Sequence, residues 1–316
     1  MKRALVTGAA GFVGSHLVER LTLDGWSVVG IDSITPYYDA SQKQANRDAV
    51  EAMGSPVRDI DLRTDELSGL LDSVDVVFHQ AGQPGVRDSW EHFASYVEHN
   101  VIATERLLRA VRDAGCRRFV YASSSSIYGD ALTFPTPEST LPRPKSPYGV
   151  TKLSAEHLCG VYARNFGVST VSLRYFTVFG PRQRPDMAMH RLFEAAMTGS
   201  QFPKFGSGSQ IRDFTYVGDV VDANLCAATV DVSDGTVVNV AGGGSITLNR
   251  VIEIVEGLVG ARVPISQEGD QAGDVERTGG DISLAAELLG WTPTTTVEEG
   301  LASQYEWHVG RRGTNP

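Results

Sequence analysis

A glycine pattern near the start of the chain limits the possible folds more than any other stretch. Residues 7–14 read T-G-A-A-G-F-V-G and directly follow the apolar run 4–7. The first glycine, Gly8, permits a tight turn, Gly11 lets the backbone approach a pyrophosphate, and Gly14 allows close packing of a helix on a strand. The amides of this loop and of the following helix would then face an anion. The pattern predicts a strand, a phosphate-binding turn and a helix.

Apolar runs and amphipathic segments alternate through the first half of the chain, which favours a parallel sheet with helices on both faces. The apolar runs predict buried strands over 4–7, 27–31, 74–79, 118–123 and 168–175. The amphipathic segments between them predict helices near 12–24, 40–52, 64–72, 91–113 and 147–166. We therefore expect an α/β fold built on a doubly wound parallel sheet, a Rossmann fold.

The second half differs in composition, with prolines and glycines concentrated in residues 176–212. One helix near 187–198 interrupts these predicted loops. Further on we expect a short strand over 237–240 and helices near 217–228, 248–259, 283–290 and 297–310. We predict that residues 1–175, together with about 215–242, form the Rossmann domain. Residues 176–214 and 243–316 would form a smaller C-terminal α/β lobe.

Composition excludes several other classes of protein. Among 316 residues, 28 basic and 38 acidic side chains give a net charge of −10, whereas a nucleic-acid-binding protein usually has a basic excess. No apolar stretch approaches the ~20 residues of a membrane span. The three cysteines are scattered, which fits a reducing cytoplasm. We therefore predict a cytoplasmic location. Neither the cysteines nor His79, His99 and His190 show metal-ligand spacing, so we predict no metal site.

An acidic residue follows the glycine loop at the expected distance. Asp32 ends the second predicted strand, 18 residues after Gly14. A carboxylate there accepts hydrogen bonds from ribose hydroxyls and repels a 2′-phosphate, which favours NAD over NADP. A flavin or nucleotide loop, or a bare structural turn, is the alternative interpretation. The stretch Asp61-Leu62 follows the third strand, where an adenine edge would lie, and Gln80-Ala81-Gly82 ends the fourth.

These positions together predict one cofactor site. Asn100, in a predicted helix, is either part of it or a satisfied polar core residue. The predicted NAD contacts are Gly8, Gly11, Phe12, Val13, Gly14, Asp32, Ser33, Asp61, Leu62, Gln80, Ala81, Gly82, Asn100, Tyr148 and Lys152.

The last two of these residues also have the spacing of a catalytic pair. Tyr148 and Lys152 are four residues apart and share one helix face, and Pro147 suits the start of that helix. An adjacent ammonium and a positive nicotinamide ring would favour the phenolate, so that Tyr148 takes a proton from a hydroxyl as hydride leaves the carbon. Ser124 lies at the carboxyl end of a predicted strand, where its hydroxyl would relay or hold the proton at the reacting oxygen. As an isolated pair, Tyr-x-x-x-Lys also occurs by chance on helix surfaces.

The combination of T-G-A-A-G-F-V-G, Asp32, H-Q-A-G (79–82), Ser124 and Y-G-V-T-K (148–152) resembles the extended short-chain dehydrogenase/reductases over essentially the whole chain. The resemblance implies a tightly held NAD, a C-terminal nucleotide-sugar lobe, and a homodimer formed through helices like those near 91–113 and 147–166. The stretches 30–39, 79–87 and 174–188 are most similar to nucleotide-sugar 4-epimerases that act on UDP-glucuronic acid.

The resemblance also implies substrate contacts. Arg212 falls where relatives hold the diphosphate, and Asp274 where they contact the uridine side. Many UDP-galactose epimerases carry Asn where this chain has Thr177, which points away from neutral hexoses. Some relatives carry an arginine where this chain has Gln271; Arg191 or Arg277 is the candidate replacement. The predicted substrate contacts are Ser124, Ser125, Ser126, Tyr148, Thr177, Arg184, Arg212 and Asp274, with Arg87 or Arg182 as alternatives to Arg184.

Members of the family differ in the step after oxidation at C4. Dehydratases resemble a pattern with Asp-Glu directly after the hydroxyl residue, and decarboxylases carry a glutamate in the same segment. This chain has Ser125 and Ser126 there, so return of the hydride to the opposite face is the simplest outcome. The resemblance therefore implies an NAD-dependent isomerase that converts UDP-glucuronic acid to UDP-galacturonic acid. A UDP-glucose/UDP-galactose 4-epimerase, a one-way sugar oxidoreductase and a non-catalytic NAD-binding regulator are the alternatives.

Overall fold

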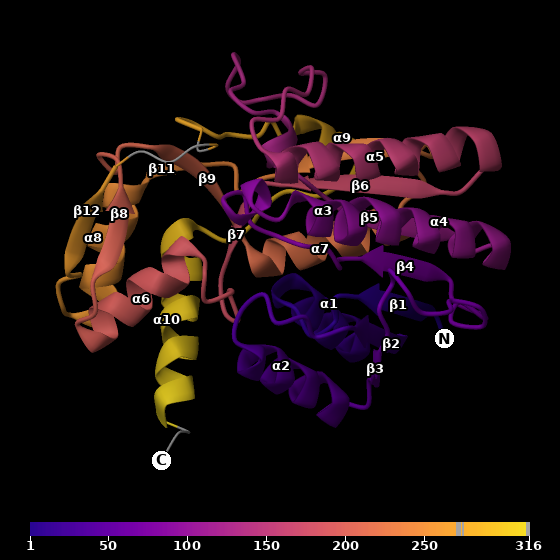
Figure 1. Ribbon diagram of the computed structural model, residues 1–316, viewed down its shortest axis with the longest axis horizontal. Coiled ribbons are helices and arrows are strands. Elements are labelled where there is room, and N and C mark those ends of the chain that lie inside the picture. Colours follow the sequence, from indigo (N-terminus) through magenta and orange to yellow (C-terminus); the bar gives the residue numbers. More distant parts are fainter. Residues whose placement is uncertain (270–272, 274, 314–316) are drawn as a thin grey trace.

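Seven parallel strands form the main sheet of the computed structural model, which describes residues 1–269, 273 and 275–313. Their order across the sheet is β10-β6-β5-β4-β1-β2-β3, so the order of successive strands reverses between β1 and β4 (Figure 1). The strands are β1 (Arg3–Thr7), β2 (Ser27–Asp32), β3 (Val57–Asp59), β4 (Val76–His79), β5 (Arg118–Ser124), β6 (Thr170–Tyr175) and β10 (Thr236–Val240). This is the doubly wound Rossmann fold that the sequence predicts.

Helices cover both faces of this sheet because its strands are apolar on both sides. Along β1, Ala4 and Val6 pack in one core cluster with α1 (Phe12–Leu23) and α7 (Val217–Thr229). Leu5, between them, packs in a second cluster on the other face, with α4 (Ala103–Ala114) and α5 (Pro147–Phe166). The remaining helices beside the sheet are α2 (Ala40–Ala52), α3 (Phe93–Val97) and α9 (Ser283–Leu289).

The second half of the chain adds a smaller lobe at one end of the main sheet, on the left of Figure 1. It contains a three-stranded and a two-stranded sheet, packed with three helices around a separate apolar core. Its elements are β7 (Thr177–Phe179), β8 (Phe202–Phe205), β9 (Ile211–Tyr216), β11 (Ser245–Thr247), β12 (Ile265–Glu268), α6 (Ala188–Thr198), α8 (Leu248–Val259) and α10 (Val297–Gly313). The domain boundaries near 175, 215 and 242 remain predictions.

Several predicted elements differ from the structure. The helix predicted near 64–72 is a series of turns, with Gly69 and Ser73 at positive φ. Leu67 and Leu71 still face the core, and this spacing of four imitates a helix. The helix predicted over 91–113 is α3 and α4 joined by a π-helical segment, Glu98–Ile102. The five short strands of the smaller lobe were predicted as loops or missed, because strands of three to six residues carry little periodicity.

No helix in the described part of the chain is long and apolar enough to cross a membrane.

Candidate active site

A cavity of about 450 Å³ lies at the carboxyl ends of the parallel strands, where the strand order reverses. Open α/β sheets place ligands at this edge. Loops that follow β1, β2, β4, β5 and β6 line the cavity, and α5 contributes Tyr148 and Lys152. Every residue that we predicted to contact NAD lines it.

The glycine loop has the close packing that the sequence predicts. Gly8 has φ +68°, and a Cβ on Gly14 would lie 2.0 Å from the Gly8 carbonyl oxygen. The helix α1 begins at Phe12, and its N-cap residue, Gly11, supplies no side-chain hydrogen bond. The first amides of α1 are therefore free of a capping side chain at the wall of the cavity. This uncapped N-terminus fits the pyrophosphate of a dinucleotide.

Asp32 connects the glycine loop to the loop after β2. Its carboxylate accepts hydrogen bonds from the backbone N–H of Ala10 at 3.1 Å and of Ile34 at 2.8 Å. Lys43, which sequence reasoning missed, also lines the cavity and is 8% exposed. Burial lowers the pKa of its ammonium, and the negative charge of Asp32 opposes that shift.

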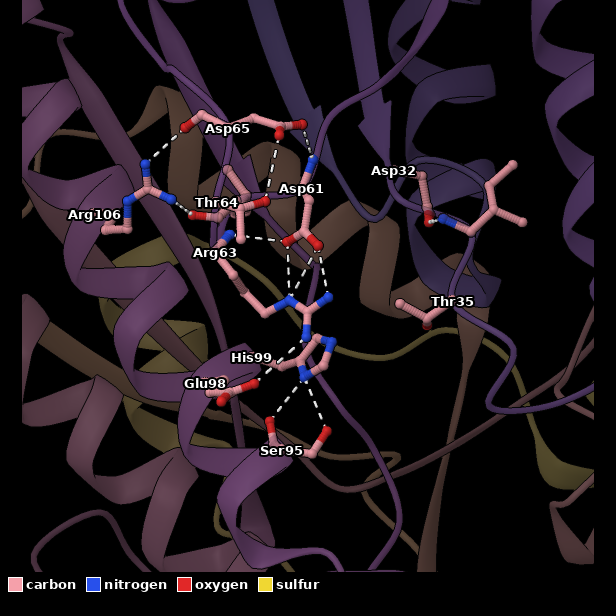
Figure 2. A network of polar contacts seen from close by, with 12 residues as sticks. Asp32, Thr35, Asp61, Arg63, Thr64, Asp65, Ser95, Glu98, His99 and Arg106 are labelled. Carbon is pink, nitrogen blue, oxygen red and sulfur yellow. Dashed lines mark hydrogen bonds and ion pairs between the residues drawn. The ribbon is translucent and has the colours of Figure 1, made fainter.

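A network of charged side chains surrounds Asp61, which we predicted to lie at the adenine edge (Figure 2). The guanidinium of Arg63 donates to both carboxylate oxygens of Asp61, with the shortest distance 2.6 Å, and this lowers the pKa of Asp61. Arg63 also lies 3.5 Å from a Glu98 carboxylate oxygen. His99 lines the cavity beside them; its Nδ1 lies 2.7 Å from the Ser95 carbonyl oxygen, while its buried Nε2 has no partner in the described part of the chain.

Asn100 lines the cavity, but its side chain binds the protein itself. The amide Oδ1 accepts the Gln83 N–H at 2.7 Å, and Nδ2 donates to the Gln83 carbonyl at 3.1 Å and to Thr151 Oγ1 at 3.0 Å. The π-helical turn places Asn100 between the loop after β4 and helix α5. It thus has the bonds of a satisfied polar core residue, and a cofactor contact stays a prediction.

The three predicted catalytic side chains all line the cavity. Tyr148 is close enough to Ser124 for the serine hydroxyl to influence its pKa, and Ser124 Oγ accepts the Ser126 N–H at 3.2 Å. Lys152 is 7% exposed, and its Nζ lies 4.5 Å from the centroid of the Tyr121 ring. Ser146 caps α5 by accepting the Gly149 N–H at 3.1 Å, with Pro147 in the first turn, which fixes the helix register.

Burial is the largest influence on the pKa values of Tyr148 and Lys152. It raises the pKa of Tyr148, while the Ser124 hydrogen bond and the positive charge of Arg184 act in the opposite direction. Burial lowers the pKa of Lys152 to about 8, despite the nearby Glu156 carboxylate. The residues around Tyr148 therefore do not by themselves favour its phenolate, and the predicted role of the ammonium together with a nicotinamide ring stays a prediction. A further positive charge is required, as a bound nicotinamide would supply.

A buried ion pair supports the strand that carries Ser124. Glu156, one turn after Lys152, accepts hydrogen bonds from Arg174 at 2.7 Å and 3.0 Å and from Ser123 Oγ at 2.6 Å. Both charged side chains are under 10% exposed. Arg174 also donates to the Tyr128 hydroxyl at 2.6 Å. The network ties α5, β5 and β6 together directly behind the reacting groups.

Hydroxyl groups continue the wall beyond Ser124. Ser125 and Ser126 form a 3-10 turn after β5, and Thr177 begins β7. Arg184 lines the same end, where its guanidinium is bound to the Asp186 carboxylate at 2.8 Å and 2.9 Å. Among the described residues that line the cavity, Asp32 and Asp61 are the only carboxylates. Both lie on the loops at the predicted adenosine end.

Comparison with known proteins agrees with this geometry. Residues 4–241 match the profile of the NAD dependent epimerase/dehydratase family. The chain belongs to this family. It is 41% identical over 307 residues, 96% of both chains, to a Bacillus subtilis protein named uncharacterized UDP-glucose epimerase YtcB.

Two solved structures are similar over 98% of this chain and 99% of their own chains. UDP-glucuronic acid 4-epimerase from Bacillus cereus, in complex with UDP-glucuronic acid and NAD, is 39% identical with a TM-score of 0.94. MoeE5, in complex with UDP-glucuronic acid and NAD, is 42% identical with a TM-score of 0.88.

Some predicted contacts of this epimerase/dehydratase family member lie outside the cavity. Arg212 is on β9, where its Nη1 donates to the carbonyls of Ile211 at 3.0 Å and Glu276 at 3.3 Å. Asp274 and Gln271 lie outside the described residues. The alternative arginines are also elsewhere: Arg87 lies over the Phe205 ring, Arg182 pairs with Glu19, Arg277 lies over Phe134, and Arg191 lines a second hollow.

Sequence reasoning gave no role to several residues that line the cavity. Tyr37 and Tyr38 lie in the motif 30–39, and both line the cavity together with Arg184. The loop after β4 adds Gln83–Val86, and α6 is preceded by Met187. The motif itself was the available signal for the two tyrosines. No signal in the sequence marked Arg63 and Lys43, because their approach to the cavity depends on how the loops fold.

Proposed function

We propose that this chain is an NAD-dependent 4-epimerase that converts UDP-glucuronic acid to UDP-galacturonic acid. One observation carries the proposal: the Ser124–Tyr148–Lys152 group shares a cavity with the glycine loop, and no described carboxylate lines its reacting end. An acid or base there is what the elimination or decarboxylation reactions of similar enzymes need. The complexes of the Bacillus cereus enzyme and of MoeE5 with UDP-glucuronic acid and NAD support the same substrate and cofactor.

Some residues of the cavity would bind NAD, and others would carry out the proton transfer. The N-terminus of α1 and the glycine loop would hold the pyrophosphate of NAD, and Asp32 its adenosine ribose. When bound, NAD accepts a hydride from C4 of the sugar and returns it. Tyr148 takes the proton of the C4 hydroxyl and gives it back after the sugar has turned over. Ser124 holds the reacting oxygen through its hydroxyl, and the ammonium of Lys152 stabilises the phenolate.

The smaller lobe would hold the nucleotide while the sugar turns. We assign this role to residues 176–214 and 243–316, with Arg212 on the diphosphate and Asp274 on the uridine side. Support comes from the place of β7, which brings Thr177 from this lobe to the cavity. Binding through UDP, rather than through the sugar ring, leaves the ring free to present either face to the hydride.

A glucuronate adds a specific hazard, because its 4-keto form is a β-keto acid that can lose carbon dioxide. That loss requires the bond to the carboxyl carbon to align with the carbonyl π system. We propose that the hydroxyls of Ser125, Ser126 and Thr177 bind the carboxylate and hold this bond out of alignment, with added charge from Arg184. All four side chains line the end of the cavity that holds Ser124.

Replacing Thr177 with alanine is expected to weaken binding of UDP-glucuronate by about tenfold, because one hydrogen bond to a charged group is lost. The freed carboxylate should also produce a UDP-pentose by-product. Affinity is measured by calorimetry and products by NMR, with Thr198→Ala on the exposed end of α6 as a matched control. Unchanged affinity for UDP-glucuronate, together with no UDP-pentose, would contradict the proposed binding of the carboxylate by Thr177.

The proposed function is tested by incubating the purified protein with UDP-glucuronic acid and no added reductant, with products identified by NMR. We expect a uronate inverted at C4 and no net consumption of cofactor. Stoichiometric oxidation or reduction of added cofactor would indicate a one-way oxidoreductase, and NAD binding with no turnover of any UDP-sugar a regulator. The name of the Bacillus subtilis relative favours UDP-glucose as the second candidate substrate. Competition between UDP-galactose and UDP-galacturonate separates the two.

We further propose that the protein is a cytoplasmic homodimer that pairs through α4 and α5. Large apolar side chains on and beside these helices are exposed, among them Ile102, Val161 and Phe166. Sedimentation of wild type against Val161→Glu checks this, because a charge at the centre of an apolar interface should yield monomers.

A further inference from the structure

A second hollow, of about 580 Å³, lies between α6, α10 and the N-terminus of α2, and none of its lining residues lines the catalytic cavity. Figure 1 shows α6 and α10 side by side within the smaller lobe. Three side chains that ligate metals in proteins meet in its wall. His190 and Glu194 are one turn apart on α6, and His308 comes from α10.

The three side chains are close enough to share one ion. One potential ligand atom from each of them lies within 4.8 Å of the other two. The nearest pair, His308 Nδ1 and Glu194 Oε1, is 3.1 Å apart. Two donors at ~2.05 Å from a tetrahedral zinc ion are about 3.3 Å apart, so small side-chain rotations would close the set. The sequence gave no signal for this group, because 118 residues separate the two histidines.

The ring of His190 is already oriented as a ligating histidine is. His190 Nδ1 lies 2.8 Å from the Gln183 carbonyl oxygen, so Nδ1 carries the proton and the lone pair is on Nε2. A second hydrogen bond of this kind fixes the ring of most metal-ligating histidines. His308 is 2% exposed; its Nδ1 pairs with Glu194, and its buried Nε2 has no partner among the described residues. The lone pair of His190 is therefore available, whereas an ion held between His308 and Glu194 would replace the contact between those two side chains.

We propose that His190, Glu194 and His308 form a binding site for a divalent transition-metal ion of the zinc class, separate from the catalytic cavity. Two imidazoles and one carboxylate are a ligand set that zinc accepts, with a water or an anion from the hollow in the remaining position. The ion would join α6 to α10. It would also brace the loop before α6, which carries Arg184 and Met187 into the catalytic cavity.

Three arginines oppose the ion and set a testable limit on its affinity. Arg191, Arg311 and Arg312 line the same hollow, and Arg312 binds the second oxygen of Glu194 at 2.7 Å. Arg312 therefore competes with the metal for the carboxylate and adds repulsion. Removing this guanidinium should strengthen metal binding, whereas it would weaken a purely structural cluster of side chains.

The test uses the full-length, tag-free protein after treatment with a chelator. Titration with Co²⁺ should give visible absorption bands that saturate at one ion per chain and disappear on addition of Zn²⁺. Zn²⁺ should raise the melting temperature by a few degrees, since a ligand of the folded state stabilises it. Neither readout depends on epimerase activity, so failure of the proposed function leaves this result intact.

Variants decide whether these three residues are responsible. His190→Asn and Glu194→Gln should each lower the Zn²⁺ affinity at least tenfold, and Arg312→Gln should raise it several-fold. The matched control is His92→Asn, whose side chain is 63% exposed and pairs only with Asp88 among described residues. Glu194 is 41% exposed, so its variant should fold even if the His190 variant does not. Featureless Co²⁺ spectra, equal affinity in the Glu194 and His92 variants, or weaker binding to Arg312→Gln would each overturn the proposal.

Discussion

Tyr148→Phe is expected to lower kcat by a factor of about 10²–10⁴, the range that a positioned general acid–base contributes. Phenylalanine fills the same space beside Tyr96 and keeps the α5 register, but it has no proton to exchange with the C4 oxygen. The interaction with the Ser124 hydroxyl is lost as well. The measurement is the steady-state rate of C4 inversion, followed by NMR.

Tyr162→Phe is the matched control for this variant. Tyr162 lies on the same helix, outside the cavity, and donates its hydroxyl to Glu105 at 2.7 Å. Its variant should keep kcat within about twofold and lose only a fraction of the stability, because an intramolecular hydrogen bond contributes ~1 kcal/mol. A Tyr148→Phe enzyme that inverts C4 at the wild-type rate would exclude the proposed mechanism.

Glu156→Gln is expected to lower the free energy of unfolding by about 3–5 kcal/mol, because it leaves the Arg174 charge buried without a counter-ion. The side chains of Arg174 and Glu156 are 7% and 3% exposed, so solvent cannot replace the lost partner. The effect should be visible as a lower midpoint in urea. The loosened Ser123 should also disturb the neighbouring Ser124, so kcat should fall while cofactor binding is retained.

An exposed ion pair offers the comparison. Arg250 and Glu253 lie 3.0 Å apart on α8, with side chains 56% and 62% exposed. Glu253→Gln should change the free energy of unfolding by less than about 1 kcal/mol, because exposed pairs are screened by water. If the two variants unfold at the same urea concentration, burial does not control the contribution of Glu156.

Prediction from sequence succeeded best where one short segment carries the whole signal. Helix α5 begins at Pro147 and ends at Phe166, as predicted, because Ser146, Pro147 and Gly167 mark its ends locally. The glycine loop was predicted equally well, because the turn geometry and close packing that require glycine arise within the same short segment. The turns around Leu67 were misread, since apolar spacing alone does not distinguish a helix from turns that bury the same side chains.

The candidate site was predictable to the extent that its residues follow strands. Asp32, Gln80 and Ser124 reach one cavity because parallel strands end at the same edge of a sheet. Arg212 was placed by resemblance; its guanidinium donates to main-chain carbonyls, and its contact with the diphosphate stays a prediction. The proton affinity of Tyr148 was also out of reach, because burial controls it and burial depends on the assembled fold.

Local chemistry was sufficient to identify a Rossmann sheet, a dinucleotide loop and a tyrosine–lysine pair, because each depends on neighbours within a few residues. The hydrogen bonds of Asn100 to Gln83 and Thr151, the ion pair of Arg174 with Glu156, and the contact of His190 with His308 form only in the folded chain. These contacts join segments or loops whose approach no periodicity records. The long-range packing of helices and loops creates them, and with them the electrostatic environment of both cavities.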